Sequence, residues 1–545
     1  MEALPLTDEF KAEVLAWIED DPDPKTKALL QNWLDSGSVD ELRGCFQGFL
    51  EFGTAGIRGP LGPGPSRMNR AVVSKTAYGI AQFMLKNSLK SIVIGRDARY
   101  GSEDFTRDTA EIMSGVGFEV FVLPRPLPTP VLAFAVKKLG CDVGVMVTAS
   151  HNPPQDNGYK VYLGGTVRGV RYDGSQIIAP TDSEISAEIA KTPSLSTVRR
   201  GMDWTVLGEE VVNEYVQSTS RLATSPEKLK IVYTAMHGVG KETLLKVFSQ
   251  AGFDEPILVS EQAEPDPDFP TVAFPNPEEP GAIDLSLKLA REVEADLVIA
   301  NDPDADRCAV AICDGEWRML RGDEVGALLG EYLAGKANVD NNVLANSIVS
   351  SSILSKIAKA HNLPFTETLT GFKYLAKVEN LRFGYEEALG YSVDANSVND
   401  KDGISAALVI AQLAADLKRQ GRNIANFLDE IWAKYGFHGT RQISVRTKSI
   451  DDIEKIMGRL RKNLPVNLGS FKVSSFDDLE RPKDGLPPTN GVRLWLDGKY
   501  RVIVRPSGTE PKIKCYIEVI TEKAELALPI LDSLESEFRT LMKVA

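Results

Sequence analysis

The chain has 545 residues, 43% of them hydrophobic and 25% charged, with a formal net charge of −14 at pH 7. This composition is typical of a globular protein with several cores, and a usual domain size of about 150 residues predicts three or four domains. The acidic balance argues against nucleic acid or an anionic membrane surface as the main partner, because such binding needs clustered lysine and arginine.

Residues 1–48 form a predicted helical extension. The stretches "DEFKAEVLAWIEDD" and "KTKALLQNWLDSG" carry apolar residues at helical spacing and are separated by the helix breaker "DPDP". The N-terminus lacks the basic segment of a secretory signal, and no apolar run approaches the roughly 18 residues that span a bilayer. The five cysteines are scattered without a CxxC pair, which argues against a disulfide framework or a zinc site. We therefore expect a soluble, cytoplasmic protein.

Residues 49–436 repeat one pattern of strand, helix, strand, helix, strand and loop. The first copy runs from "SIVIGRDAR" to "CDVGVMVTASHNP", and the second from "LKIVYTAMHGVG" to "ADLVIANDPDADR". A looser third copy runs from "NNVLANSIVSSS" to "LRFGYEEALGY". Such alternation predicts helices packed on largely parallel or mixed sheets. We expect three similar α/β domains, at residues 49–206, 207–320 and 321–436.

The last part of the chain, residues 437–545, has a different pattern. "GTRQISVRT", "VRLWLDGKYRVIVRPSG" and "IKCYIEVIT" alternate like antiparallel strands, and a final helical segment follows, so we expect an α+β domain. Ligands of α/β sheets bind beyond the carboxyl ends of the strands. If the domains face one another, the loops "TASHNP", "NDPDADR" and "GYEEALGY" converge on one cleft.

Ser150 directly follows the apolar strand "VGVMV". A serine at such a place often only caps a turn or helix. A catalytic role is also open, because His151 and Lys160 can each handle a proton and a serine hydroxyl needs such help to act as a nucleophile. Adjacent side chains on an extended chain point opposite ways, so the Ser150–His151 pair does not predict a hydrolase triad.

The segment "DPDADR" carries alternating carboxylates at Asp302, Asp304 and Asp306. An extended loop aims all three the same way, and like charges that close repel unless a cation lies between them. Hard oxygen ligands select Mg²⁺ or Ca²⁺, and a small aspartate cage suits Mg²⁺ with a phosphate oxygen. A solvated acidic turn is the alternative, while the glycine and glutamate of an EF-hand are missing. Arg307 would place a cation beside the site.

A third group of polar residues lies in "RPSGTEPKIKCY". Arg505 offers a planar fork of donors, and Gly508 allows backbone N–H groups to approach an oxyanion. The segment adds two hydroxyls and two lysines, at Ser507, Thr509, Lys512 and Lys514. The set fits a phosphate, and it is also consistent with an ordinary turn between strands.

Two further segments carry weaker signals. "FGTAGIRG" is a glycine-spaced loop that carries Arg58, and most glycine loops only turn the chain. "FGYEEALGY" supplies Glu386 and Glu387, which are either a solvated acidic face or carboxylates that fix sugar hydroxyls.

Taken together, "TASHNP", "DPDADR", "EEALGY" and "RPSGTEPK", in this order, resemble the α-D-phosphohexomutase superfamily. That superfamily includes phosphoglucomutases, phosphomannomutases and phosphopentomutases. The resemblance covers nearly everything from Phe52 onward. It implies a four-domain fold around a central cleft, with three similar α/β domains and a C-terminal α+β domain.

The resemblance also implies the chemistry. Ser150 would carry a phosphoryl group, give it to a sugar monophosphate and recover the other phosphoryl group from the resulting bisphosphate. One Mg²⁺ per chain would bind to Ser150, Asp302, Asp304 and Asp306, and a sugar bisphosphate would serve as primer. The implied catalytic residues are Ser150, His151, Lys160 and Arg58. The implied substrate-binding residues are Arg307, Thr370, Gly371, Lys373, Glu386, Lys401, Arg505, Ser507, Gly508, Thr509 and Lys514.

Two positions in the sugar-binding motif depart from the superfamily. Ala388 replaces a hydroxyl residue of the "GEES" form, and Tyr391 stands where some members carry a histidine. The second acid/base group is therefore open, with Lys401 in "NDKDG" as a candidate. The form "EEALGY…DKDG" is similar to the branch that contains eukaryotic-type phosphopentomutases.

The leading hypothesis is a mutase that interconverts hexose 1-phosphate and hexose 6-phosphate, with glucose first and mannose next. A phosphopentomutase, a sugar bisphosphate synthase and a non-catalytic phosphosugar sensor are the alternatives. The expected partner is a phosphorylated sugar, without nucleic acid or membrane, and the expected state is a monomer or weak dimer.

Overall fold

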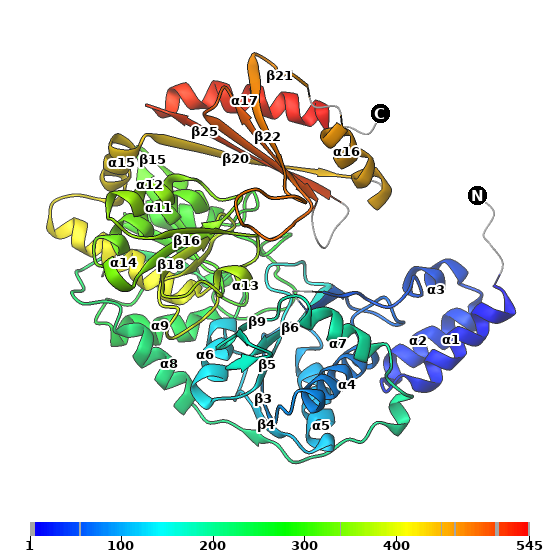
Figure 1. Cartoon of the computed structure of the whole chain (residues 1–545). Coiled ribbons are helices and arrows are strands. Elements are labelled where there is room, and N and C mark those ends of the chain that lie inside the picture. The colour runs from blue at the N-terminus through cyan, green and yellow to red at the C-terminus, as the bar shows by residue number, and fades with distance from the viewer. Residues whose placement is uncertain are drawn as a thin grey trace. The chain divides into compact units, whose positions relative to one another are not determined.

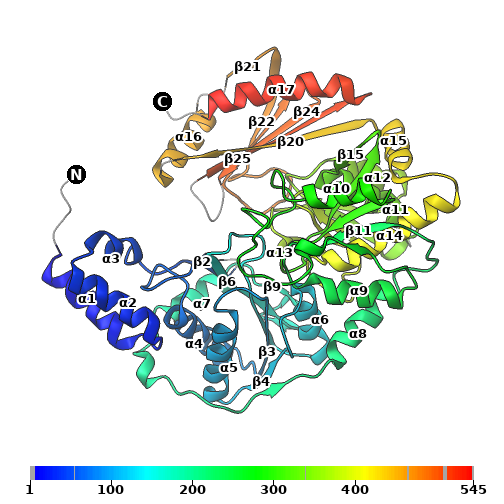
Figure 2. The same cartoon turned by 180° about the vertical axis from the view of Figure 1, so that it is seen from behind.

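The computed structural model describes residues 6–53, 56–337, 339–447, 449–462, 465–506 and 512–542. The chain forms two compact units. Unit 1 comprises residues 1–319 and 390–419, and unit 2 comprises residues 320–389 and 420–545. The predicted third α/β repeat therefore contributes to both units. Figures 1 and 2 show the elements of each unit from opposite sides.

Unit 1 begins with three helices that share a small core of their own. Thr7 and Asp23 cap the first two helices through side-chain oxygens, and Val14, Leu30 and Leu42 form the buried contact between the helices. An ion pair of 2.7 Å between Asp20 and Lys75 ties this group to the following domain. The helices are α1 (Asp8–Asp20), α2 (Pro24–Ser36) and α3 (Val39–Cys45).

The next domain of unit 1 is built on a mixed sheet in the order β1-β2-β6-β5-β3-β4-β10. Strands β3, β4 and β5 are parallel, whereas β6 runs antiparallel to β5 and β2. Figure 1 shows α4, α5 and α7 on one side of these strands and α6 on the other. The strands are β1 (Phe52–Gly53), β2 (Gly56–Pro60), β3 (Ser91–Arg96), β4 (Glu119–Val122), β5 (Val143–Val147), β6 (Asp156–Leu163), β7 (Thr166–Val167), β8 (Val170–Arg171), β9 (Ser175–Gln176) and β10 (Thr205–Val206). The helices are α4 (Arg70–Lys86), α5 (Ser102–Val116), α6 (Thr129–Leu139) and α7 (Thr181–Ile189).

A second sheet of unit 1 has the order β12-β11-β13-β14-β15, with β11, β12 and β13 parallel. Its central strand β13 is buried along its whole length, as expected for a strand covered on both faces. The strands are β11 (Ile231–Thr234), β12 (Ile257–Leu258), β13 (Leu297–Ala300), β14 (Ala309–Asp314) and β15 (Glu316–Met319), with β19 (Gly390–Ser392) bridged to Arg307. The helices are α8 (Glu210–Ser220), α9 (Gly240–Gln250), α10 (Asp284–Glu292) and α14 (Gly403–Arg419).

Unit 2 contains a parallel sheet in the order β17-β16-β18 and a six-stranded sheet in the order β20-β25-β24-β23-β22-β21. The six strands pair antiparallel, and α17 packs along β20 and β25 (Figure 2). The strands are β16 (Val343–Ser347), β17 (Phe365–Thr368), β18 (Leu381–Glu386), β20 (Phe437–Arg446), β21 (Asn467–Leu468), β22 (Phe471–Asp478), β23 (Val492–Leu496), β24 (Tyr500–Pro506) and β25 (Lys512–Thr521). The helices are α11 (Gly322–Ala334), α12 (Ile353–Ala360), α13 (Phe372–Leu375), α15 (Ile424–Tyr435), α16 (Ile450–Lys462) and α17 (Ala524–Leu541).

The sheets confirm the predicted combination of α/β layers with a closing α+β sheet. The described helices include none whose length and apolar character would suffice to cross a bilayer.

Candidate active site

Ser150 lies just beyond the end of β5, in the loop that leads to β6. Its side chain is buried, and Oγ donates a 2.7 Å hydrogen bond to Asp302 Oδ2. The residue has φ of +51°, in the left-handed region that side chains other than glycine rarely adopt. Because of this conformation the chain is not extended here, and His151 Nδ1 lies 3.2 Å from Ser150 Oγ. The expectation that the two adjacent side chains point in opposite directions is therefore wrong.

Asp302, Asp304 and Asp306 lie together beyond the end of β13. Their carboxylate oxygens lie within 4.8 Å of one another, and all three residues are fully buried. The sequence predicted an extended loop, but the chain turns instead, with Ala305 N donating to Asp302 O and Ala305 at φ of +54°. The three carboxylates therefore meet because the chain turns, and not because alternate side chains of an extended loop point the same way.

Two lysines face these carboxylates. Lys160 projects from β6 and donates to Asp304 Oδ2 and Asp306 Oδ2, each at 2.7 Å. Lys401, from the segment before α14, lies 3.1 Å from Asp306 Oδ2. Burial lowers the pKa of Lys160, but the two carboxylates outweigh this effect and hold its pKa above the usual range. Lys160 is therefore a cation in this arrangement.

The three aspartates differ in the direction in which their surroundings shift the carboxyl pKa. Burial, followed by repulsion from Asp304 and Asp306, raises the pKa of Asp302 to about 8. Burial acts in the same direction on the other two aspartates, but Lys160 outweighs it and lowers the pKa of both. Of the three carboxyls, Asp302 is therefore the one that holds a proton most readily.

Two arginines complete the surroundings. Arg58, on β2, donates to Asn152 Oδ1 at 3.0 Å. Burial lowers the pKa of Arg58, and Asp304 and Asp306 oppose that shift from nearby. Arg307 lies 3.9 Å from Asp302 Oδ2 and 3.7 Å from a Glu278 carboxylate oxygen. Unit 1 therefore brings together Ser150, His151, Lys160, Arg58, Arg307, Lys401 and the three aspartates.

The donor set fits a hard divalent metal ion. Among the described residues, Asp304 Oδ1 and Asp306 Oδ1 are buried carboxylate oxygens without a hydrogen-bond partner. Buried charged oxygens without partners are costly, so their presence at a cluster of carboxylates indicates a cation site. Oxygen-only ligands of this kind suit Mg²⁺.

In unit 2 the predicted sugar-binding residues meet at the end of β18. Glu386 Oε1 accepts a 2.6 Å hydrogen bond from Gly371 N, which joins the motifs "EEALGY" and "TGFK". Gly371 has φ of +119°, a conformation that favours glycine. Thr370 and Lys373 flank it, and the Lys373 ammonium lies 5.3 Å from the centre of the Tyr374 ring.

The predicted phosphate-binding segment lies between β24 and β25. Arg505 and Lys514 are cross-strand partners at the ends of these strands. Tyr516 on β25 is buried. Burial, followed by Glu387, raises the pKa of its hydroxyl, and Arg505 opposes that shift. The other predicted members of this group, Ser507, Gly508 and Thr509, lie outside the described residues.

Glu387 is the second carboxyl group of "EEALGY", which the sequence left open as part of a solvated acidic face or as a carboxylate that fixes sugar hydroxyls. Ser347 Oγ and Ser350 Oγ lie 3.2 and 3.3 Å from its Oε2, and its backbone N–H donates to Ser350 Oγ. Burial, followed by Glu386 and Asp323, raises the pKa of Glu387 to about 7. Folding of unit 2 therefore takes up a proton at this position at mildly acidic pH.

We expect Glu387→Gln to stabilise the protein at pH 8. The pKa of Glu387 in the folded protein exceeds its ordinary value of 4.5. The wild-type carboxyl therefore destabilises the fold increasingly as the pH rises from 4.5 to about 7, and has no such effect below pH 4.5. The amide keeps the neutral form, so the variant should gain about 2 kcal/mol at pH 8, or about 5 °C in Tm, and nothing at pH 4.5. Thermal melts across this range test it, with exposed Glu379→Gln as control; equal Tm differences at both pH values would contradict it.

Two contacts in the transfer region were not expected from the sequence. Thr129, at the start of α6, donates through Oγ1 to Asp304 Oδ2 at 2.6 Å. Asp400 accepts hydrogen bonds from Tyr162 and Gln176, each at 2.9 Å, and so fixes the segment that carries Lys401. The "PTP" run and the "DKDG" run were visible in the sequence, but a sequence alone does not say which distant strand end each one contacts.

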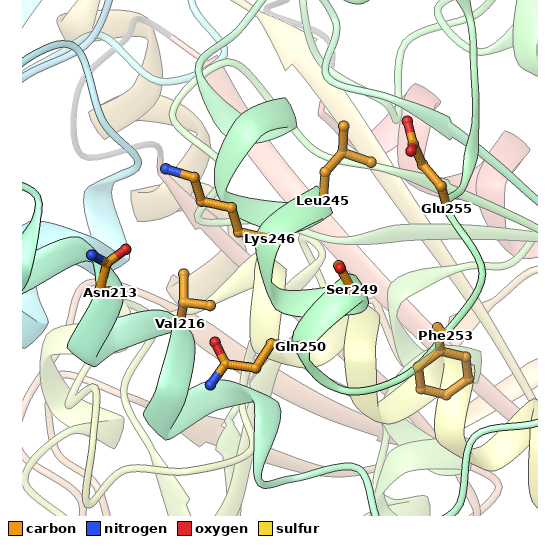
Figure 3. Close-up of a pocket in the computed structure, with 8 residues that line it drawn as sticks. All are labelled: Asn213, Val216, Leu245, Lys246, Ser249, Gln250, Phe253 and Glu255. Carbon is orange, nitrogen blue, oxygen red and sulfur yellow. The ribbon is translucent and has the colours of Figure 1, made fainter.

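A separate cavity of about 550 Å³ lies between α8 and α9. Figure 3 shows its lining side chains, which come from these two helices and the loop that follows α9. They are Asn213, Val216, Leu245, Lys246, Ser249, Gln250, Phe253 and Glu255. None of the predicted site residues belongs to this set. The chemistry therefore points to the strand ends rather than to this cavity.

Four family models match the chain in sequence order. The phosphoglucomutase/phosphomannomutase α/β/α domains I, II and III match residues 50–195, 211–315 and 321–435, and the C-terminal domain of the same family matches residues 445–528. The chain belongs to the phosphoglucomutase/phosphomannomutase family. This confirms the placement in the α-D-phosphohexomutase superfamily and the four-domain α/β architecture.

Individual relatives of this mutase cover most of its length. A "Probable phosphomannomutase" of Haemophilus influenzae is 46% identical over 485 residues, which is 87% of this chain and 98% of the relative. A phosphopentomutase of Homo sapiens is 35% identical over 566 residues, 93% of this chain and 91% of the relative. A crystal structure of a phosphoglucomutase/phosphomannomutase family protein from Burkholderia thailandensis has the same fold, with a TM-score of 0.70, 18% identity and coverage of 91% of this chain and 98% of that one. The protein is a phosphosugar mutase, an isomerase that transfers a phosphoryl group.

Proposed function

We propose that this phosphosugar mutase interconverts hexose 1-phosphate and hexose 6-phosphate, with glucose or mannose as the sugar. The route runs through a phosphoserine at Ser150 and a sugar bisphosphate. The contact between Ser150 Oγ and Asp302 carries the proposal, because it puts a buried nucleophile against a carboxylate cluster suited to a metal ion. The 46% identical relative named "Probable phosphomannomutase" supports a hexose.

The proton movements are assigned to groups around Ser150. When Oγ attacks a phosphorus atom of the bisphosphate, its proton passes to His151 Nδ1, which lies 3.2 Å away. Burial lowers the pKa of His151, so the imidazole is neutral and can accept that proton. As the bond from phosphorus to the sugar oxygen breaks, Lys160 gives a proton to that oxygen. The reverse transfers regenerate free Ser150.

Charge neutralisation is the second requirement of phosphoryl transfer. One Mg²⁺ per chain, held by Asp302, Asp304, Asp306 and an oxygen on Ser150, would supply positive charge beside the transferred group. Arg58 contributes a guanidinium to the same group, and Lys401 and Arg307 balance the aspartates. A sugar bisphosphate primer is needed because the enzyme must first be phosphorylated.

We assign sugar and phosphate binding to residues of unit 2. Glu386, held by Gly371, binds sugar hydroxyls, with Thr370 and Lys373 in the same loop. Arg505 and Lys514 supply positive charge for the phosphate that is not transferred, together with Ser507, Gly508 and Thr509. Glu387 is held by Ser347 and Ser350, and we assign it no direct role in sugar binding.

A pentose phosphate is the second candidate substrate. Ala388 follows the two glutamates directly and offers no hydroxyl to a sugar, and the 35% identical human relative is a phosphopentomutase. Under this alternative the phosphate moves between C1 and C5 of ribose or deoxyribose with the same Ser150 chemistry.

A substrate panel tests the proposal. We expect kcat/KM for glucose 1-phosphate or mannose 1-phosphate to exceed that for ribose 1-phosphate by about tenfold or more, since one lost polar contact costs at least about that factor. Each sugar is assayed with Mg²⁺ and its own bisphosphate as primer. A tenfold preference for ribose 1-phosphate or deoxyribose 1-phosphate would replace the hexose assignment by the pentose one.

Two related activities are separated by parallel assays with an acyl phosphate donor and by binding measurements. Net accumulation of sugar bisphosphate from an acyl phosphate donor would indicate a bisphosphate synthase, in which the intermediate leaves instead of turning round. Binding of all sugar phosphates without turnover of any would indicate a sensor.

A further inference from the structure

The side chain of Arg99 contacts the backbone of the Ser150 loop at four carbonyl groups. Its Nη2 donates to Ser150 O and Asn152 O, each at 2.6 Å. Its Nη1 donates to Pro153 O at 2.8 Å and Asp156 O at 3.1 Å. One guanidinium therefore binds four carbonyls between Ser150 and Asp156, from the nucleophile to the start of β6.

Three of these carbonyls, those of Ser150, Asn152 and Pro153, belong to the irregular segment between β5 and β6, and the fourth belongs to Asp156, the first residue of β6. Pro153 O also accepts a backbone hydrogen bond of 3.0 Å from Asp156 N. The loop connects β5 to β6, and Ser150 at its start is held in the left-handed conformation with φ of +51°. Buried carbonyl groups need hydrogen-bond donors, and a left-handed residue with a side chain persists only where its surroundings hold it. The Arg99 guanidinium supplies the donors at that place.

The guanidinium is itself fixed on two other sides. Arg99 Nε lies 3.4 Å from Asp97 Oδ2, and both side chains are 1% exposed. Ser102 donates to the other Asp97 oxygen at 2.8 Å, which keeps that carboxylate in place. On its face, the guanidinium carbon lies 4.8 Å from the centre of the Phe269 ring, a cation–π distance.

We propose that Arg99 is a positioning residue for phosphoryl transfer. By fixing the backbone of residues 150–156, it holds Ser150 in the conformation that directs Oγ to Asp302. The proposal rests on the phosphoserine route proposed above. It assigns to the "GRDAR" segment, which begins within the end of β3, a role in the rate of transfer rather than in sugar binding.

The chemistry requires arginine rather than any cation. A lysine ammonium at this position is a point charge with three donors and lacks the planar fork that reaches four carbonyls from two nitrogens. Arg99→Lys therefore keeps the charge and loses the geometry. Displacements of about 1 Å at a reacting atom cost on the order of 10²-fold in rate.

The test measures single-turnover transfer from phosphorylated enzyme to sugar monophosphate in the presence of Mg²⁺. We expect Arg99→Lys to slow transfer about 100-fold while KM changes by less than about threefold. Arg107→Lys is the control, because Arg107 is half exposed and forms an ion pair with the neighbouring Asp104. We further expect methylguanidinium, but not methylammonium, to restore at least about tenfold of the activity lost in Arg99→Ala.

A third variant keeps the test decisive if the Arg99 variants do not fold. Phe269→Leu removes the aromatic face and leaves Arg99 in the chain, and we expect transfer about fivefold slower with KM unchanged. A wild-type transfer rate in Arg99→Lys, or in Phe269→Leu where the Arg99 variants do not fold, would overturn the proposal while the phosphoserine route stands. A change in KM alone would also overturn it. Wild-type enzyme that acquires no phosphoryl group on Ser150 would instead refute the proposed function, and this proposal with it.

Discussion

A Ser150→Ala variant is expected to lose turnover by a factor of about 10⁴ or more, because the phosphoryl group has no other oxygen to which it can be passed. Binding of the sugar phosphate should stay within about threefold of the wild-type value. The groups assigned to the sugar and to the distant phosphate, such as Glu386 and Arg505, are untouched by this change. Steady-state kinetics and equilibrium titration with a sugar monophosphate measure the two effects separately.

The matched control is Ser183→Ala. Ser183 is an exposed serine on α7 that donates to Pro180 O, and its loss should leave turnover unchanged. Intact mass measured after incubation with a sugar bisphosphate gives an independent readout. Wild-type enzyme and the control should each gain one phosphoryl group, and Ser150→Ala should gain none. Full turnover by Ser150→Ala, or phosphoryl uptake by it, would contradict the phosphoserine route.

The sequence was sufficient to find the main elements of the site because each of them lies at a strand end. Ser150 follows β5 and the aspartates follow β13, and the apolar runs that form these strands are visible without any structure. The β-strand pattern and the residues after it thus predict both the fold class and the position of the polar groups. The same reasoning placed Glu386 at the end of β18.

The backbone conformation of the polar loops could not be predicted in the same way. The left-handed φ at Ser150 and Ala305 accompanies hydrogen bonds from distant residues, from Arg99 to Ser150 O and from Gly403 N to Ala305 O. An extended chain was therefore expected at both places. As a result the contact between Ser150 and His151 was missed. The three aspartates were correctly expected to meet, but a turn at Ala305 brings them together instead of the expected extended loop.

Long-range pairing was the second limit. Lys401 was assigned to the third repeat, yet its segment packs in unit 1, where Asp400 accepts from Tyr162 and Gly403 N donates to Ala305 O. Residues 238 positions apart in the sequence, Tyr162 and Asp400, form one buried hydrogen bond. No local pattern encodes such a pair, because each partner has ordinary neighbours in its own segment.

The charges that surround the aspartates differ between Asp306 and Asp302. Lys160 and Lys401 both reach Asp306, whereas Asp302 faces a serine hydroxyl and a more distant arginine. Asp306 is therefore well neutralised without metal, and Asp302 is not. Without metal, the stability of the protein should therefore change in opposite directions when each residue is replaced by asparagine, although both are proposed as metal ligands.

We expect both Asp306→Asn and Asp302→Asn to lower kcat by about 10³-fold, the scale of several kcal/mol of charge stabilisation at the transferred group. Both should also lose the rise in Tm that Mg²⁺ produces in the wild-type protein, since binding to the folded state alone stabilises it. Thermal melts with and without Mg²⁺ provide a readout that does not depend on activity. Asp314→Asn is the control, because that side chain is 52% exposed at the end of β14.

In the presence of a chelator, the two variants should separate. The pKa of Asp302 is raised to about 8, so its ionisation costs stability as the pH rises toward 8, and asparagine removes that cost. Asp302→Asn should therefore melt about 5 °C above the wild type at pH 8.

The pKa of Asp306 is lowered by its lysines, so loss of this carboxylate leaves the charges of Lys160 and Lys401 less compensated, and Asp306→Asn should melt below the wild type. Equal shifts of the same sign would show that the two carboxylates are not distinguished by these lysines, and an unchanged Mg²⁺ response in either variant would remove that residue from the metal site.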